Sequence, residues 1–140
     1  MMRLRYVLAL AFLLSSPGSA GADDALVMLL AEADATRGER VYRKCRSCHT
    51  TEQGGQERLG PNLYGIVGGP VAGSSGFAKY SKALLGLGGE WTVELLDAYL
   101  ANPRKAVPGT TMVFNGLRKD RDRADVIVFM NSFSDAPLEF

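Results

Sequence analysis

The stretch KCRSCHTTEQGG, residues 44–55, decides how the rest of the chain has to be arranged. It holds Cys45, Cys48 and His49, which are the only two cysteines and the only histidine among 140 residues. Thiol and imidazole groups are the reactive and metal-binding side chains of proteins. A chain that gathers all of them within five consecutive positions has one chemical site there, and the surrounding sequence has to build it.

Three familiar uses of a Cys-x-x-Cys pair do not suit this chain. A disulfide across two intervening residues closes too short a loop to add much stability to a domain. A redox-active pair is expected beside a βαβ pattern, which the sequence lacks. A structural zinc site needs four cysteine or histidine ligands, and the chain has three. The remaining use, Cys-x-x-Cys-His, is the attachment motif of c-type haem.

In a c-type haem site each of the three side chains has a task. Cys45 and Cys48 lie three positions apart, so both can form thioethers to the vinyl groups of one porphyrin, and His49 can then bind the iron. We therefore predict one covalent haem c. The second axial position of the iron has no histidine left to fill it. Met112 is the best remaining donor, because it follows the rigid turn at Pro108 and Gly109, where a methionine that only fills a core is less expected.

The first 22 residues have the pattern of a secretory signal peptide. Arg3 and Arg5 precede an apolar run, residues 6–14, and small residues follow as far as Ala22. The run is shorter than the roughly 20 residues that span a bilayer, which favours a cleaved signal over a retained anchor. We expect a periplasmic protein without stable membrane insertion.

Cleavage after Ala20 or Ala22 fits the pattern equally well. It would leave an N-terminal extension at 23–35 and one domain at 36–140. The whole chain has 16 basic and 15 acidic residues. Without the first 22 residues the count becomes 14 against 15, so the mature chain is nearly neutral. No bulk attraction to nucleic acid is expected.

Three segments carry helical patterns. The first is expected from about Arg37 into the haem motif, with Thr36 and Glu39 as a capping box. Its buried face comprises Gly38, Val41, Tyr42 and Cys45. The second opens at the N-cap Thr92, ends before Pro103, and carries an apolar stripe of Leu95, Leu96, Tyr99 and Leu100. The third is expected from about Asp122 to Phe133, with Val126, Ile127, Phe129 and Met130 buried.

Between the first two helices, GPNLYGIVGGPVAGSSGF (60–77) is too rich in glycine, proline and serine for a helix or a central strand. We expect a wrapping loop that places four apolar residues against the porphyrin: Leu63, Tyr64, Ile66 and Val67. No alternating strand pattern of useful length occurs. The predicted fold class is all-α with long loops.

The haem motif with its GPNL loop, the segment YLANPRKAVPGTTMVFNGL and the segment RADVIVFM together resemble the class I c-type cytochromes. The similarity is greatest to the bacterial cytochrome c2 and mitochondrial cytochrome c group and covers roughly residues 38–133. It implies a small all-α fold in which the N- and C-terminal helices cross and long loops wrap one haem. In that fold Gly38 and Phe129 form the helix contact.

The resemblance also implies a role for each site residue. Cys45 and Cys48 would form the thioethers, and His49 and Met112 would be the iron ligands. The Pro61 carbonyl would accept the His49 ring N–H, which orients the ring. The other implied positions are Tyr99 near the Met112 sulfur, Tyr80, Trp91 and Thr110 at the propionates, and Phe114 over the exposed haem edge. Gln53, Gln56 and Thr111 stand where relatives carry docking lysines, whereas Lys44, Arg58, Arg104, Lys105, Arg118 and Lys119 keep part of that ring.

Three functions are compatible with this pattern. The first is a small monomeric electron carrier, not an enzyme, that cycles between Fe(II) and Fe(III). Its redox partners would be complexes such as a cytochrome bc1 complex and a terminal oxidase or reaction centre, because His/Met ligation leaves no open iron position. The second is a haem subunit docked permanently to an oxidoreductase complex, for which the apolar extension 23–35 is the best support. The third is a haem enzyme or gas sensor with a labile Met112.

Overall fold

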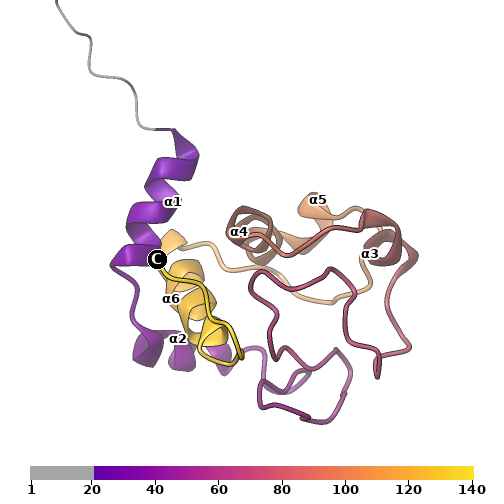
Figure 1. Ribbon diagram of the computed structural model, residues 1–140. Helices are drawn as coiled ribbons and strands as arrows, with labels where there is room; N and C mark the ends of the chain where they lie inside the picture. The colour runs from indigo at the N-terminus through magenta and orange to yellow at the C-terminus, as the bar shows by residue number, and fades with distance from the viewer. Residues whose placement is uncertain (1–20) are drawn as a thin grey trace, which may run out of the picture.

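The computed structural model describes residues 21–140, so the predicted signal peptide lies almost wholly outside the described residues. These described residues form six helices in chain order: α1 Ala22–Ala31, α2 Ala35–Tyr42, α3 Lys82–Leu87, α4 Val93–Ala101, α5 Pro103–Ala106 and α6 Asp120–Asn131 (Figure 1). Between residues 21 and 140 there is no strand, only an isolated antiparallel bridge of Pro70 with Glu90. The all-α class is confirmed, and residues 60–77 form a loop as predicted.

The crossing of α2 and α6 is the most extensive contact between the helices that the structure describes (Figure 1). A Cβ atom added at Gly38 would lie 2.0 Å from the carbonyl oxygen of Asp125 and 2.7 Å from the Cβ of Phe129. Side chains normally hold packed helices 8–10 Å apart between axes, and only a bare glycine lets the backbone of one helix touch the other. The predicted contact of Gly38 with Phe129 is confirmed.

The predicted start of α2 was wrong. Asp34, not Thr36, is the N-cap, and its carboxylate accepts a hydrogen bond from the Arg37 backbone N–H at 2.7 Å. Both residue types are good caps, but the Asp34 N–H is itself held by the Asp125 carboxylate at 2.8 Å, which fixes the cap two residues earlier. The helix also ends at Tyr42, and turns carry the chain through the haem motif.

The other two predicted helices are present with shifted ends. Thr92 caps α4 through a 3.2 Å bond from the Leu95 N–H, as expected. Helix α6 begins at Asp120 rather than near Asp122 and ends at Asn131. The buried Arg123 explains the earlier start, because its guanidinium pairs with the Asp120 carboxylate one turn back at 2.7 Å. Of the predicted face, Val126, Ile127 and Met130 are buried and Phe129 is partly buried.

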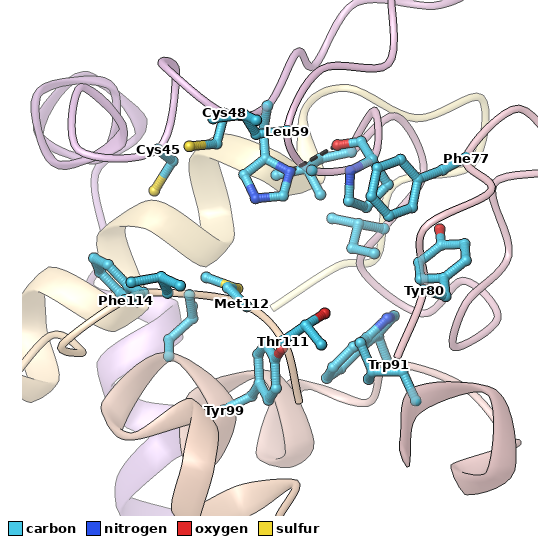
Figure 2. Close-up of a pocket in the computed structure, with 18 of the residues that line it drawn as sticks. Cys45, Cys48, Leu59, Phe77, Tyr80, Trp91, Tyr99, Thr111, Met112 and Phe114 are labelled. Atoms are coloured by element: carbon cyan, nitrogen blue, oxygen red, sulfur yellow. Dashed lines mark hydrogen bonds between the residues drawn. The ribbon is translucent and has the colours of Figure 1, made fainter. Parts of the chain in front are cut away.

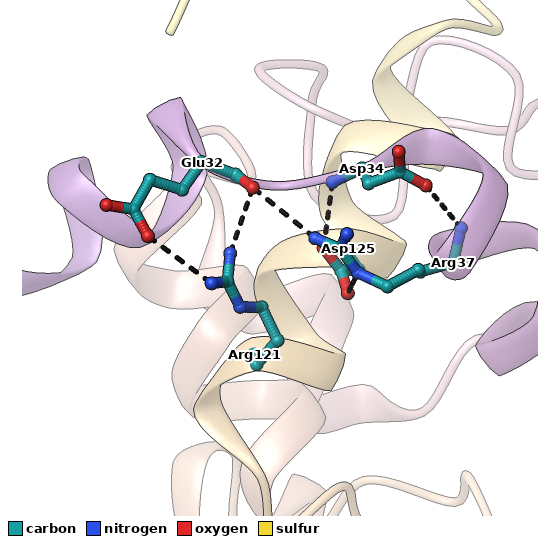
Figure 3. Close-up of polar contacts among 5 residues, drawn as sticks. All are labelled: Glu32, Asp34, Arg37, Arg121 and Asp125. Atoms are coloured by element: carbon teal, nitrogen blue, oxygen red, sulfur yellow. Dashed lines mark hydrogen bonds and ion pairs between the residues drawn. The ribbon is translucent and has the colours of Figure 1, made fainter.

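Helix α1 packs on α6 as part of the same core. Leu26 and Leu30 are buried, while Val27 and Met28 are exposed. Figure 3 shows how the end of α1 is held: the Glu32 carbonyl accepts hydrogen bonds from Arg37 Nη2 at 3.3 Å and from Arg121 Nη1 at 2.9 Å. Within residues 21–140, no helix has the length and apolar character needed to cross a membrane.

Asp125 is the buried centre of the polar contacts in Figure 3. Its Oδ2 accepts a hydrogen bond from Arg37 Nε at 2.8 Å, and its Oδ1 accepts from Arg37 Nη2 at 2.9 Å. Burial opposes ionisation of this carboxyl, but the bonds from Arg37 and from the Asp34 amide, with the positive charge of Arg37, outweigh it. The pKa of Asp125 is therefore lowered. The ion pair joins the start of α2 to α6.

Replacing Asp125 with asparagine is expected to lower the free energy of unfolding at neutral pH by about 1–3 kcal/mol, because it breaks a charge-assisted pair. A carboxyl whose pKa is lowered by folding stabilises the protein above its unfolded pKa of about 3.9, and this contribution is lost as the pH falls toward the folded value. Denaturant unfolding from pH 7 to pH 3 should therefore show the wild type and Asp125→Asn converging in acid. A constant gap would contradict this role.

Candidate functional site

A cavity of about 380 Å³ lies between the haem motif, the loop after residue 60, α4, α6 and the segment around Met112 (Figure 2). Its volume is within the range of cofactor pockets, about 300–1,000 Å³. Its walls are mostly aliphatic and aromatic. The predicted site residues that line it are Cys45, Cys48, His49, Pro61, Tyr80, Trp91, Tyr99, Met112 and Phe114. Of the predicted site residues, only Thr110 lies outside the lining.

Cys45 and Cys48 present free thiols at one end of the cavity, away from Trp91 and Tyr80 (Figure 2). The turn between them is closed by backbone bonds from the Cys48 and His49 N–H groups to the Cys45 carbonyl, each 3.0 Å. Burial raises the pKa of the Cys45 thiol to about 11. The geometry brings both sulfurs and the histidine to one wall of one cavity.

His49 is buried and its ring is held from two sides. Its Nδ1 lies 2.7 Å from the Pro61 carbonyl oxygen, marked by the dashed line in Figure 2. Gly60 lies against the ring so closely that an added Cβ would be 2.2 Å from Cε1. Burial lowers the pKa of His49, and the bond to Pro61 opposes that effect only in part. The neutral imidazole is favoured, with Nδ1 donating to Pro61 and Nε2 left as the ring's acceptor.

Met112 lines the cavity across from the haem motif (Figure 2). Two residues earlier, the Thr110 hydroxyl lies 2.7 Å from the Tyr99 hydroxyl and 3.4 Å from the Met112 backbone nitrogen. Tyr99 is buried, and burial raises its pKa, which keeps the hydroxyl protonated. The Thr110 hydroxyl is thus already hydrogen-bonded to Tyr99. Its expected bond to a haem propionate stays a prediction.

The end of the cavity remote from the cysteines is aromatic. The rings of Trp91 and Tyr99 are 4.9 Å apart between centroids, and those of Phe77 and Tyr80 are also 4.9 Å apart in an edge-to-face arrangement. The Tyr80 hydroxyl accepts a hydrogen bond from the Ser74 N–H at 3.1 Å. Trp91 is buried, and its indole N–H is a donor available to a group placed at this end.

Two of the four loop residues expected against the porphyrin line the cavity, and two do not. Leu63 and Ile66 lie in the lining, whereas Val67 is buried in the general core. Tyr64 turns away, and its hydroxyl donates to the Asp135 carboxylate at 2.8 Å. The periodicity of the segment could not separate these residues, because each successive turn at Gly65, Gly68 and Gly69 redirects the side chains.

Several residues of the lining were missed from the sequence, among them Phe77, Leu84 and Leu59. Phe77 and Leu84 come from a segment without a clear apolar period, and only their aromatic or aliphatic character was a signal. Leu59 is 77% exposed, so a search for buried apolar residues would not have identified it as part of the lining. The only sequence signal is its position directly before Gly60 and Pro61.

The residues present fit a covalent haem. Two thiols and an imidazole lie on one wall, a thioether sulfur lies on the opposite wall, and mostly apolar side chains line the cavity between them. These are the donors that bind haem in c-type cytochromes, and an apolar cavity suits the porphyrin face.

Comparison with known proteins points to one family. The chain is 42% identical over 108 residues to a cytochrome c of Theileria parva, covering 76% of this chain and 92% of that protein. It is 45% identical over 120 residues to a cytochrome c homolog of Bradyrhizobium diazoefficiens, covering 85% of this chain but 65% of that longer protein. A comparison with protein-family models finds no match.

A solved structure of cytochrome cH from Methylobacterium extorquens has the same architecture. It superposes with a TM-score of 0.66 at 37% identity, covering 71% of this chain and 99% of that one. The identities of 42% to the Theileria parva protein and 37% to cytochrome cH, each over more than nine tenths of that protein, show the family. The chain belongs to the class I c-type cytochromes, a family of electron carriers, and carries one covalent haem c.

Proposed function

We propose that this protein is a monohaem electron carrier that shuttles single electrons between membrane or periplasmic redox complexes. Cys45 and Cys48 would form the thioethers, and His49 and Met112 would be the axial iron ligands. The observation that carries the proposal is the fixed His49 ring, 2.7 Å from the Pro61 carbonyl, facing a cavity that Met112 lines from another segment. An iron held between these two side chains has no position for a substrate, so we propose no catalytic activity.

The bound haem supplies reversible one-electron chemistry. The chain's own residues limit how far the haem ligands move when the iron changes its oxidation state. Pro61 fixes the orientation of His49, and the bonded pair of Tyr99 and Thr110 fixes the segment just before Met112. Ligands held in place from outside the cavity need little rearrangement between oxidation states. Rapid electron exchange follows from that rigidity.

The mouth of the cavity supports brief docking to redox partners such as a cytochrome bc1 complex and a terminal oxidase or reaction centre. Leu59 and Val113, 77% and 88% exposed, line the cavity and form an apolar rim. Lys44 and Lys79 lie on the same lining and are exposed. A small apolar rim flanked by positive charge suits a short-lived contact with an acidic partner.

We also propose that the carrier is monomeric and periplasmic, after export directed by residues 1–22. The alternative of a permanently docked subunit relied on the apolar residues of 23–35. Of these apolar residues, Leu26 and Leu30 are buried within the chain's own core. That packing leaves Val27 and Met28 as the large apolar residues of α1 that are exposed, a small area for a permanent interface.

Replacing Met112 with alanine tests the proposed ligation. The oxidised wild type is expected to show the weak near-infrared sulfur-to-iron band, and Met112→Ala should lose it entirely. The midpoint potential should also fall, because a thioether ligand favours reduced iron. The measurement is absorption spectroscopy combined with a redox titration.

Met28→Ala is the matched control, since Met28 is 64% exposed on α1. It should keep both the band and the potential of the wild type. A wild type without the band, or a Met112→Ala variant that retains it, would remove Met112 from the ligand set and favour the haem enzyme or gas sensor alternative.

A further inference from the structure

Glu57 joins two separate segments of the haem cavity. Its Oε2 accepts a hydrogen bond from the Asn62 backbone N–H at 2.6 Å. Its Oε1 accepts a short hydrogen bond from the Ser74 hydroxyl, 17 positions along the chain. The loop approaches this carboxylate closely, because a Cβ added at Gly76 would lie 3.0 Å from Oε1. One partly buried side chain therefore has both of its oxygens engaged, each by a different loop.

Both bonded segments lead directly to residues of the cavity. Asn62 follows Pro61, whose carbonyl holds the His49 ring. On the other side, the Ser74 N–H donates to the Tyr80 hydroxyl at 3.1 Å, and Tyr80 packs edge-to-face on Phe77. Figure 2 shows Tyr80 and Phe77 at the same side of the cavity. A continuous chain of bonds thus runs from the histidine side to the aromatic end.

The charge of Glu57 also reaches the site. In the part of the chain that the structure describes, no basic side chain forms an ion pair with it. The Asn62 N–H that donates to Glu57 and the Pro61 carbonyl that holds the His49 ring belong to the same peptide group, so the carboxylate is one peptide group away from the ring. A negative charge this near the site favours the more positive oxidation state of a bound iron.

We propose that Glu57 is a positioning residue of the haem site: its carboxylate clasps segment 61–62 to segment 74–80 and so holds Tyr80 and Phe77 against the bound group. The inference rests on the proposed function only where the midpoint potential of the haem is interpreted. The clasp itself is a property of the chain and can be measured separately.

Four variants of the haem-loaded protein separate the clasp from the charge. Glu57→Ala removes both, and Ser74→Ala removes one bond but keeps the charge. Glu57→Gln removes the charge but keeps both bonds, because the amide oxygen can accept from the Asn62 N–H and the amide nitrogen can donate to the Ser74 hydroxyl. Glu39→Ala is the control, since Glu39 is an exposed carboxylate on α2. The measurements are amide hydrogen exchange of residues 74–80 and the midpoint potential.

Exchange of residues 74–80 is expected to rise about tenfold in Ser74→Ala, equivalent to about 1.4 kcal/mol for one lost hydrogen bond. It should rise further in Glu57→Ala and stay near the wild-type rate in Glu57→Gln. The potential should move in opposite directions in the two milder variants: down in Ser74→Ala, because water gains access to the site, and up in Glu57→Gln, because a negative charge is lost. A purely structural role would not give opposite signs.

Exchange in Glu57→Ala that matches Glu39→Ala would overturn the clasp, as would Glu57→Gln exchanging as fast as Glu57→Ala. Should Glu57→Ala fail to fold, Ser74→Ala and Glu57→Gln still decide the question. Absence of the sulfur-to-iron band from the wild type would defeat the proposed ligation, yet the exchange rates would continue to report on the clasp. The two failures can therefore be told apart.

Discussion

A variant with alanine at both Cys45 and Cys48 is expected to lose covalent haem attachment completely. These are the only cysteines in the chain, so no other thiol can form a thioether. The test is expression in a host with cytochrome c maturation, followed by denaturation and acid–acetone extraction. The wild-type polypeptide should keep its colour after extraction, and the double variant should release all of its haem to the organic phase.

The two single variants provide the internal control. Cys45→Ala and Cys48→Ala each retain one thiol on the same wall of the cavity, so each should keep a single thioether and part of the colour. A double variant that retains covalent haem, or a wild type that releases it, would return the Cys-x-x-Cys pair to the disulfide or redox interpretations.

The second large effect is expected from Gly38→Ala, which should destabilise the fold by more than about 3 kcal/mol. The added methyl group would lie 2.0 Å from the Asp125 carbonyl oxygen and 2.6 Å from its carbon. Those atoms belong to the backbone of α6 and cannot rotate aside as a flexible side chain could. Relief requires α2 and α6 to separate, which exposes the core beneath the crossing. Denaturant unfolding would measure the loss.

Gly86→Ala is the matched control for this substitution. Gly86 also lies within a helix, α3, but an added Cβ there meets nothing within 4 Å. Alanine should be neutral or stabilising by about 0.5–1 kcal/mol at that position, because glycine lowers helix stability. Equal stability of Gly38→Ala and Gly86→Ala would refute the close crossing of α2 with α6.

The helices with strong local signals could be predicted from the sequence. A cap at Thr92, a stop at Pro103 and a repeating apolar face define α4 without reference to anything outside it. The start of α2 was harder to place because Asp34 and Thr36 are both acceptable N-caps. The choice between them depends on Asp125, which holds the Asp34 N–H from the far end of the chain. A local pattern cannot contain that information.

The same reason limits what could be said about the site. Cys45, Cys48 and His49 are adjacent in sequence, so their convergence needed no tertiary contact to be inferred. Glu57 and Ser74 carry no motif, and their importance comes only from the folding of two loops onto each other. Helix α3 was missed because it has only six residues, contains Gly86 and is followed directly by Gly88. Short glycine-containing helices are stabilised by their surroundings rather than by propensity.

The crossing of α2 with α6 has a consequence for the order in which the chain can fold. Arg37 and Asp125, which join the two helices, are 88 positions apart. Closing so long a loop costs conformational entropy, which is lost before the contact between the helices forms. An isolated helix of eight residues is not stable in water, so α2 depends on that contact. A nascent chain that ends before Asp120 would contain the haem motif and Met112 but would lack the helix on which α2 packs. The residues that attach the haem are therefore synthesised before the helix that fixes α2, so we expect the stable fold to form only after α6 is complete.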